Sequence, residues 1–229
     1  MYDIVYILKE DVSAEELRYS LRSLKNFPHG KVWFYGGKPE GINPDYHVPF
    51  RQKGIMPWEK VISTIYEVSK NSQITEDFWL FNDDFYIMQP VEEMPNYYDK
   101  TLFRRIQAIE KTRGGARSLY TQQLRRTREA LQGEGYKTIN YEVHMPMLIN
   151  RAKAKRLIEN YPKMCMFRST YGNVYNIGGE QHRDMKIANT ELEPPKDCDF
   201  LSTADDPMEE TAVGRFIMAR FPEPCKYED

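Results

Sequence analysis

The chain has 229 residues, of which 41% are hydrophobic and 29% are charged, with a formal net charge of −2. This length and apolar content suit one ordinary domain with its own core, and no run approaches the roughly 20 apolar residues of a membrane-spanning helix. Three cysteines (Cys165, Cys198 and Cys225) have neither the number nor the spacing of a disulfide framework or a zinc site. Because no signal peptide precedes the first expected strand, we expect a cytoplasmic protein.

The first 40 residues alternate between apolar runs and a helical pattern. Residues 2–8 predict a buried strand, and Ser13 with Glu16 three residues later has the form of a capping box that opens a helix. Residues 31–35 predict a second strand, which ends at two glycines. Because a strand, a helix and a strand within so short a stretch form a βαβ unit, we expect a parallel sheet.

A second unit of the same kind follows. Residues 38–57 predict a loop that carries Arg51 and Lys53, and residues 58–69 predict a helix with one buried face. The apolar run 78–81 is typical of a strand buried on both faces. This order of elements predicts an α/β, Rossmann-like domain with a mostly parallel central sheet and helices on both faces. Ligands of such sheets bind at the carboxyl ends of the strands.

The strand at 78–81 stops abruptly at Asn82, Asp83 and Asp84. Adjacent carboxylates at the end of a buried strand are costly to desolvate unless a positive group neutralises them. Oxygen ligands suit Mg²⁺ or Mn²⁺, and the pattern matches the acidic motif with which nucleotide-sugar transferases hold the cation that bridges the donor's diphosphate. An ordinary turn in which Asn and Asp serve turn chemistry is the alternative.

Residues 104–128 carry eight basic side chains against a single acidic one, Glu110. The eight are Arg104, Arg105, Lys111, Arg113, Arg117, Arg125, Arg126 and Arg128. Two adjacent glycines at 114 and 115 predict two short helices around a turn, as an insertion at about 104–135 within a single domain that covers 1–229. The segment is either a solvated helical face or a surface for something anionic, such as a phosphate or an acceptor.

The C-terminal third holds further candidates. Residues 140–149 predict a strand-to-turn junction that contains His144, and a histidine at such a place can be a general base, a metal ligand or a structural residue. Residues 167–179 predict a polar, glycine- and asparagine-rich loop. Residues 199–207 repeat the apolar step into paired carboxylates, Asp205 and Asp206, which alternatively cap a final helix over 208–220.

Four blocks, in this order, resemble the Stealth family, which comprises capsular polysaccharide phosphotransferases and the catalytic part of N-acetylglucosamine-1-phosphotransferase. Residues 16–24 resemble the family's ELRYSLRSI helix, 81–84 its YLNDD strand end, 144–146 its HMP block, and 167–169 its Phe-Arg-His stretch, with Ser169 in place of the His. Residues 200–205 and 221–224 resemble the closing blocks more loosely. The family's Asp-Gly-x-Asp element has no clean copy, because residues 9–12 are Lys-Glu-Asp-Val.

This resemblance implies a GT-A-like fold and the metal-dependent transfer of a sugar-1-phosphate from a nucleotide-sugar donor to a polysaccharide or another hydroxyl acceptor. The residues that it and the chemistry assign are catalytic His144, Asp84 and Arg168, metal-binding Asp83 and Asp84 for Mn²⁺ or Mg²⁺, and donor-binding Arg18, Arg51, Lys53 and Asn82. His144 would act as the base and Arg168 would clamp a phosphate.

Other functions stay open at this point. The missing acidic element leaves open a GT-A glycosyltransferase that moves the sugar itself to a glycan, or to a modified base of a nucleic acid bound by the basic residues 104–128. A metal-dependent phosphohydrolase that uses both acidic pairs, and a binding module without activity, are the remaining alternatives.

Overall fold

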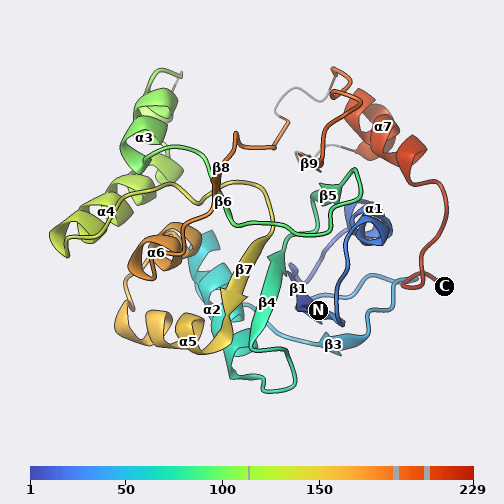
Figure 1. Ribbon diagram of the computed structural model, residues 1–229, viewed down its shortest axis with the longest axis horizontal. Coiled ribbons are helices and arrows are strands. Elements are labelled where there is room, and N and C mark those ends of the chain that lie inside the picture. The colour runs from blue at the N-terminus through green and yellow to red at the C-terminus, as the bar shows by residue number, and fades with distance from the viewer. Residues whose placement is uncertain (113, 188–190, 204–206) are drawn as a thin grey trace.

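The computed structural model describes residues 1–112, 114–187, 191–203 and 207–229, and a five-stranded sheet lies at its centre (Figure 1). The strand order is β3-β2-β1-β4-β7, with bounds Tyr46–Val48, Val32–Tyr35, Asp3–Ile7, Asp77–Phe81 and Met147–Asn150. All neighbours run parallel except β7, which is antiparallel to β4. The fold is therefore mixed α/β with a mostly parallel sheet, as the sequence predicts.

Strands β1 and β4 are apolar at every position after their first residues, Asp3 and Asp77, because both faces of the sheet are covered. Val5 pairs with Leu80 and Tyr6 with Phe81 in the parallel register of β1 and β4. Successive side chains alternate between faces, so Tyr6 and Phe81 pack in one apolar cluster while Val5 and Leu80 pack in another.

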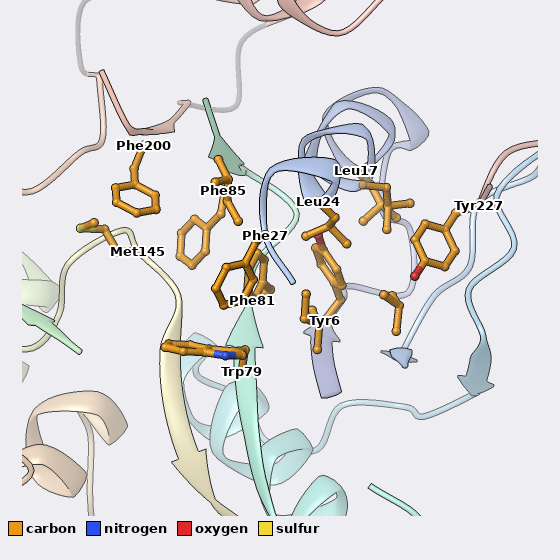
Figure 2. Packing of buried hydrophobic residues seen from close by; sticks show 14 of the residues in the cluster. Tyr6, Leu17, Leu24, Phe27, Trp79, Phe81, Phe85, Met145, Phe200 and Tyr227 are labelled. Atoms are coloured by element: carbon orange, nitrogen blue, oxygen red, sulfur yellow. The ribbon is translucent and has the colours of Figure 1, made fainter. Parts of the chain in front are cut away.

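Helix α1 (Ala14–Ser23) and the short 3-10 helix η1 (Leu24–Asn26) cover one face. Figure 2 shows the aromatic side chains on this side, where the rings of Tyr6 and Phe81 lie 5.4 Å apart and Phe27 meets Trp79 edge to face at 5.6 Å. Of the predicted capping box, the Ser13 cap is confirmed, since its hydroxyl accepts a hydrogen bond from the Glu15 amide at 3.2 Å, whereas the Glu16 carboxylate accepts from Thr203.

Helices α2 (Pro57–Lys70), α5 (Arg151–Asn160) and α6 (Phe167–Val174) cover the other face. The prediction of a loop from residue 167 was wrong for α6. Gly172 suggested a turn, but it serves a close approach: a Cβ there would lie 2.5 Å from ring carbons of Tyr141. Tertiary packing thus decides the residue type at this helical position.

The basic segment forms two helices, as predicted. Helices α3 (Leu102–Glu110) and α4 (Leu119–Gly133) are joined through a 3-10 turn, η2 (Gly115–Arg117), and lie to one side of the sheet (Figure 1). Leu102 and Ile106 of α3 pack on Leu124 and Leu131 of α4 in a separate apolar cluster. Arg113 lies outside the described residues.

Two small sheets and a last helix complete the structure. Strand β5 (Phe85–Ile87) pairs antiparallel with β9 (Phe200–Ser202), and β6 (Tyr97–Tyr98) pairs parallel with β8 (Glu180–Gln181). The predicted helix 208–220 is divided into a 3-10 turn, η3 (Met208–Glu210), and α7 (Ala212–Arg220), because Thr211 caps α7 by accepting from the Gly214 amide at 2.9 Å. The expected caps Asp205 and Asp206 lie outside the described residues.

The C-terminal end is held to α1 by charged groups. The carboxylate of Glu228 accepts hydrogen bonds from Arg22 Nε at 2.7 Å and from Arg18 Nη1 at 2.8 Å, and its side chain is 1% exposed. The three cysteines are free thiols. No helix in the described part of the chain has the length and apolar character needed to cross a membrane.

Candidate active site

A two-lobed groove lies at the carboxyl ends of β1 and β4. We call one lobe, of about 560 Å³, the acidic lobe; its lining includes Glu16, Asp83, Asp84, His144 and Lys186. The other, of about 790 Å³, is the outer lobe, and its lining includes Arg51, Gln52 and Gly54 and the start of α2. The lobes share Lys9, Asp11, Asn82 and Asp83, which form the boundary between them.

His144 enters the groove because β7 runs against its neighbours. Met147 at the start of β7 pairs with Leu80 near the end of β4. The amino end of the antiparallel strand therefore lies at the same sheet edge as the carboxyl ends of the parallel strands. The sequence predicted a strand before His144, but the strand follows it, and the histidine sits on the loop that leads into β7.

Asp84 is a buried carboxylate with one satisfied oxygen. Its residue is 8% exposed, and Oδ2 accepts a hydrogen bond from Ser202 Oγ at 3.0 Å. Lys186 Nζ lies 3.7 Å from the same oxygen. Oδ1 is buried and has no hydrogen-bond partner. A buried carboxylate oxygen without a donor is costly, so this atom is suited to a positively charged ligand.

The residues around Asp84 fit a divalent cation only if a ligand completes its coordination. No group of three or more His, Cys, Asp or Glu side chains that could hold a metal occurs within the described ranges of the chain. Mg²⁺, however, is usually held by one or two carboxylates together with substrate phosphates and water. Asp83 and Asp84, with the partnerless Oδ1, satisfy that smaller requirement.

The imidazole of His144 is fixed by a carboxylate that the sequence did not single out. His144 Nδ1 lies 2.9 and 3.1 Å from the two oxygens of Asp184, and the His144 backbone amide donates to Asp184 Oδ1 at 3.1 Å. Burial opposes the charge on Asp184, but the hydrogen bonds from His144 outweigh it and lower the pKa of this carboxyl to about 2. An ionised carboxylate only accepts, so Nδ1 carries a proton, and in a neutral imidazole Nε2 is then the nitrogen with the lone pair.

Arg168 supports the loop that carries His144. Its Nη1 donates to the carbonyl of Met145, and its guanidinium lies over the Phe85 ring at 5.5 Å. Nη2 is buried without a hydrogen-bond partner. Burial lowers the pKa of Arg168, against the opposing effect of the nearby carboxylates of Glu142, Asp84 and Asp184. Arg168 therefore places a positive charge among the acidic groups of the site.

The four residues predicted to bind the donor lie in different places relative to the groove. Asn82 lines both lobes, and Arg51 lines the outer lobe with a side chain that is 91% exposed, 3.7 Å from Glu10. Lys53 is exposed on the same loop, where its backbone amide donates to Ser63. Arg18 lies apart from both lobes, because its guanidinium is paired with Glu228.

Some of the basic side chains on α3 and α4 make contacts within the protein. Arg105 of α3 lies 3.6 Å from Asp184, Arg125 pairs with Glu110, and Arg128 lies over the ring of Phe103 at 4.9 Å. Arg104, Lys111, Arg117 and Arg126 are exposed.

Two residues at the site were missed from sequence: Lys186, which lines the acidic lobe, and Asp184, which contacts His144. Both follow β8 in a polar run whose composition indicates a functional loop. Nothing in the local sequence, however, indicates that Asp184 contacts a histidine 40 positions earlier. Ser202, which binds Asp84, is separated from it by 118 positions.

Comparisons with known proteins give only distant similarities. No protein-family model and no curated protein matches the chain. It is similar to the solved structure of the galactosyltransferase LgtC in complex with donor and acceptor sugar analogs, with 14% identity over 74% of this chain and 68% of that chain and a TM-score of 0.39. An active-site mutant of LgtC gives the same identity and coverage with a TM-score of 0.40.

Proposed function

We propose that the chain is a nucleotide-sugar-dependent transferase that moves a sugar-1-phosphate from its donor to an acceptor hydroxyl. The observation that supports this best is the meeting of Asp83, Asp84 and His144, whose Nδ1 faces Asp184, in one lobe at the carboxyl ends of β1 and β4. This is the edge of an α/β sheet at which ligands bind. A candidate phosphate-neutralising site and a candidate base thus lie together.

Asp83 and Asp84 are the residues that would hold Mg²⁺ or Mn²⁺, and the cation would neutralise the donor's diphosphate. The chain supplies further positive charge of its own. Lys9 lines both lobes, Arg51 the outer lobe and Lys186 the acidic lobe. A diphosphate that crosses the boundary at Lys9 would meet all three cations, with the nucleoside in the outer lobe and the sugar in the acidic lobe.

His144 is suited to take the proton from the attacking hydroxyl. It lines the acidic lobe, so the acceptor would enter there, and Nε2 is the ring nitrogen with a lone pair once Nδ1 is bound to Asp184. The ionised carboxylate of Asp184 would stabilise the imidazolium that results. Arg168 would keep the loop of His144 in place through the carbonyl of Met145.

Glycosyl transfer is the second candidate, and the chemistry of residues 9–11 favours it. The family that the sequence resembles has a second acidic element at the place of residues 9–11. In this chain, Lys9 and Asp11 are the residues of that stretch that line both lobes. With a cation in that position, loss of a nucleoside diphosphate is assisted as readily as loss of a monophosphate. The two reactions then differ only in the atom that is attacked, phosphorus or the anomeric carbon.

The released nucleotide separates these reactions. The protein is incubated with Mn²⁺ or Mg²⁺ and a panel of nucleotide sugars, with and without glycan and nucleic-acid acceptors. A nucleoside monophosphate formed only with acceptor supports the proposal, and a diphosphate supports glycosyl transfer. Product formed equally without acceptor indicates a phosphohydrolase, and donor binding without any product indicates a binding module.

A histidine variant tests the assignment of the base. His144→Ala should lower kcat by about 10²- to 10⁴-fold and leave the affinity for the donor unchanged, because a general base contributes that much to the rate. His182→Ala is the matched control, since this histidine bonds to the neighbouring Arg183 carbonyl and lines neither lobe. Equal rates in the two variants would exclude His144 as the base.

A further inference from the structure

Asp184 does more than fill space beside His144, because its contacts come from three directions. Oδ1 accepts from the backbone amide and Nδ1 of His144 and, at 3.3 Å, from the Lys186 amide. Oδ2 faces Nδ1 at 3.1 Å and Arg105 Nη2 at 3.6 Å. The His144 loop, the segment after β8 and helix α3 therefore meet at one carboxylate.

We infer that Asp184, held by Arg105, is a positioning residue that fixes the proton of His144 on Nδ1 and turns Nε2 toward the acidic lobe. The inference rests on the proposed role of His144 as the base. It assigns Arg105 a role separate from the surface charge of the other basic residues in 104–128. That arginine links the α3–α4 helices to the catalytic groove.

The burial of the three side chains supports this reading. The side chain of His144 is 32% exposed, that of Asp184 17% and that of Arg105 26%, so exposure is greatest at the ring that must reach a substrate. A partly buried carboxylate between an imidazole N–H and a guanidinium stays ionised and well oriented. Such an outer partner fixes the tautomer of a histidine and the direction of its other nitrogen.

The ion pair with Asp184 distinguishes Arg105 from the neighbouring basic residues. Arg104, adjacent on α3, is exposed, and Arg125 of α4 pairs with Glu110 of α3. Within the described part of the 104–128 segment, Arg105 is the basic residue whose ion pair reaches Asp184, the partner of His144.

Asp184→Asn separates positioning from a purely structural role. The amide oxygen of Asn can still accept the backbone N–H of His144, so the loop keeps that anchor. The amide oxygen would also remain 2.9 Å from Nδ1 but would carry no full charge, and the amide nitrogen, a donor, would replace Oδ2 at 3.1 Å from Nδ1. The proton is then held on Nδ1 less firmly, and the fraction of His144 protonated on Nε2, which cannot act as a base, should rise.

The first test reads the tautomer without any substrate. Imidazole ¹⁵N spectra are recorded on histidine-labelled protein at mildly alkaline pH, where imidazoles are mostly neutral, and His144→Gln identifies the signals. We expect a protonated Nδ1 in the wild type, a larger fraction protonated on Nε2 in Asp184→Asn, and no change in Asp197→Asn, which alters an exposed aspartate. A wild-type His144 protonated on Nε2 would overturn the inference, whether or not the variant folds.

The second test uses turnover. Asp184→Asn should lower kcat by about 10²- to 10⁴-fold, and Arg105→Gln by about 10- to 100-fold, with the KM for the donor unchanged in both. Arg104→Gln removes the same charge from the same helix and should leave kcat unchanged. Equal kcat values for the two arginine variants would exclude Arg105 from the positioning. If the wild type shows the expected tautomer but no nucleotide sugar is turned over, the proposed function fails while the positioning of His144 stands.

Discussion

Glu228 should be one of the most sensitive single positions for stability. Its carboxylate accepts from Arg22 Nε and Nη2, both at 2.7 Å, from Arg18 Nη1 at 2.8 Å, and from the Cys225 amide at 3.0 Å. The side chain is 1% exposed, whereas those of Arg22 and Arg18 are 10% and 34% exposed. Glu228→Gln keeps the shape but replaces one acceptor with an amide group that faces a guanidinium.

The expected decrease in the free energy of unfolding follows from these exposures. Removing one partner of a buried ion pair costs about 3–5 kcal/mol. Arg18 can turn to water, and Arg22 Nη1 keeps its bonds to the carbonyls of Phe221 and Pro222, so we expect the lower end, about 3 kcal/mol. For a chain of this length that free energy corresponds to a fall in Tm of about 6–12 °C.

Urea denaturation followed by the fluorescence of the buried tryptophans measures the loss. Glu223→Gln makes the same change of charge at an exposed residue and should stay within about 0.5 kcal/mol of the wild type. If Glu228→Gln unfolds at the same urea concentration as Glu223→Gln, the ion-pair reasoning is wrong.

The effect should also depend on pH. Burial raises the pKa of Glu228, but the hydrogen bonds from Arg22 and the Cys225 amide outweigh it and lower the pKa to about 2 from an ordinary 4.5. A carboxyl with a lowered folded-state pKa stabilises the fold fully above its unfolded pKa and loses that contribution as the pH falls through the folded one. The difference between wild type and Glu228→Gln should therefore be constant near neutral pH and shrink between about pH 4.5 and 2.

Two other substitutions test the groove and the packing behind it. Asp84→Asn should lower turnover by at least about 10²-fold, since it weakens the proposed site of the cation that neutralises the donor's diphosphate, while Glu92→Gln, at an exposed acid, should not. Unchanged turnover in Asp84→Asn would rule out that role. Gly172→Ala should destabilise the protein by about 1–3 kcal/mol in urea denaturation, because the new methyl group would lie 2.5 Å from the ring of Tyr141. Gly133→Ala in α4, where a Cβ meets nothing within 4 Å, should be neutral or stabilising, and similar stabilities of the two alanine variants would contradict the packing argument.

Local patterns were sufficient for most of the sheet and its helices. Apolar runs predicted β1, β2 and β4, and the spacing of leucines after Ser13 predicted α1, because burial on both faces of a sheet or on one face of a helix leaves a periodic signature. The direction of β7 was not predictable in this way. A short strand has the same composition whether it runs parallel or antiparallel, and its partner β4 lies far away in sequence.

The candidate site was predictable where it depends on a strand end. Asn82, Asp83 and Asp84 follow β4, and the structure brings them to one lobe with His144, although their roles stay predictions. The partners of His144 and Asp84, which are Asp184 and Ser202, were not predictable, because they lie far away in sequence and are brought to the site only by folding. Arg18 illustrates the converse: its position on a helix indicated a free cation, but its partner is a carboxylate 210 positions later.

Helix α1 connects the groove with the end of the chain. Glu16 in its first turn lines the acidic lobe and accepts from Thr203, and Arg22 in its last turn holds Glu228. Ten helical residues span only about 15 Å, so release of the last residues would free the Arg22 end of α1 from its anchor close to the acidic lobe. Gentle heating should therefore abolish donor binding before the central sheet melts, and proteolytic trimming at the C-terminus should inactivate a protein whose core is still folded.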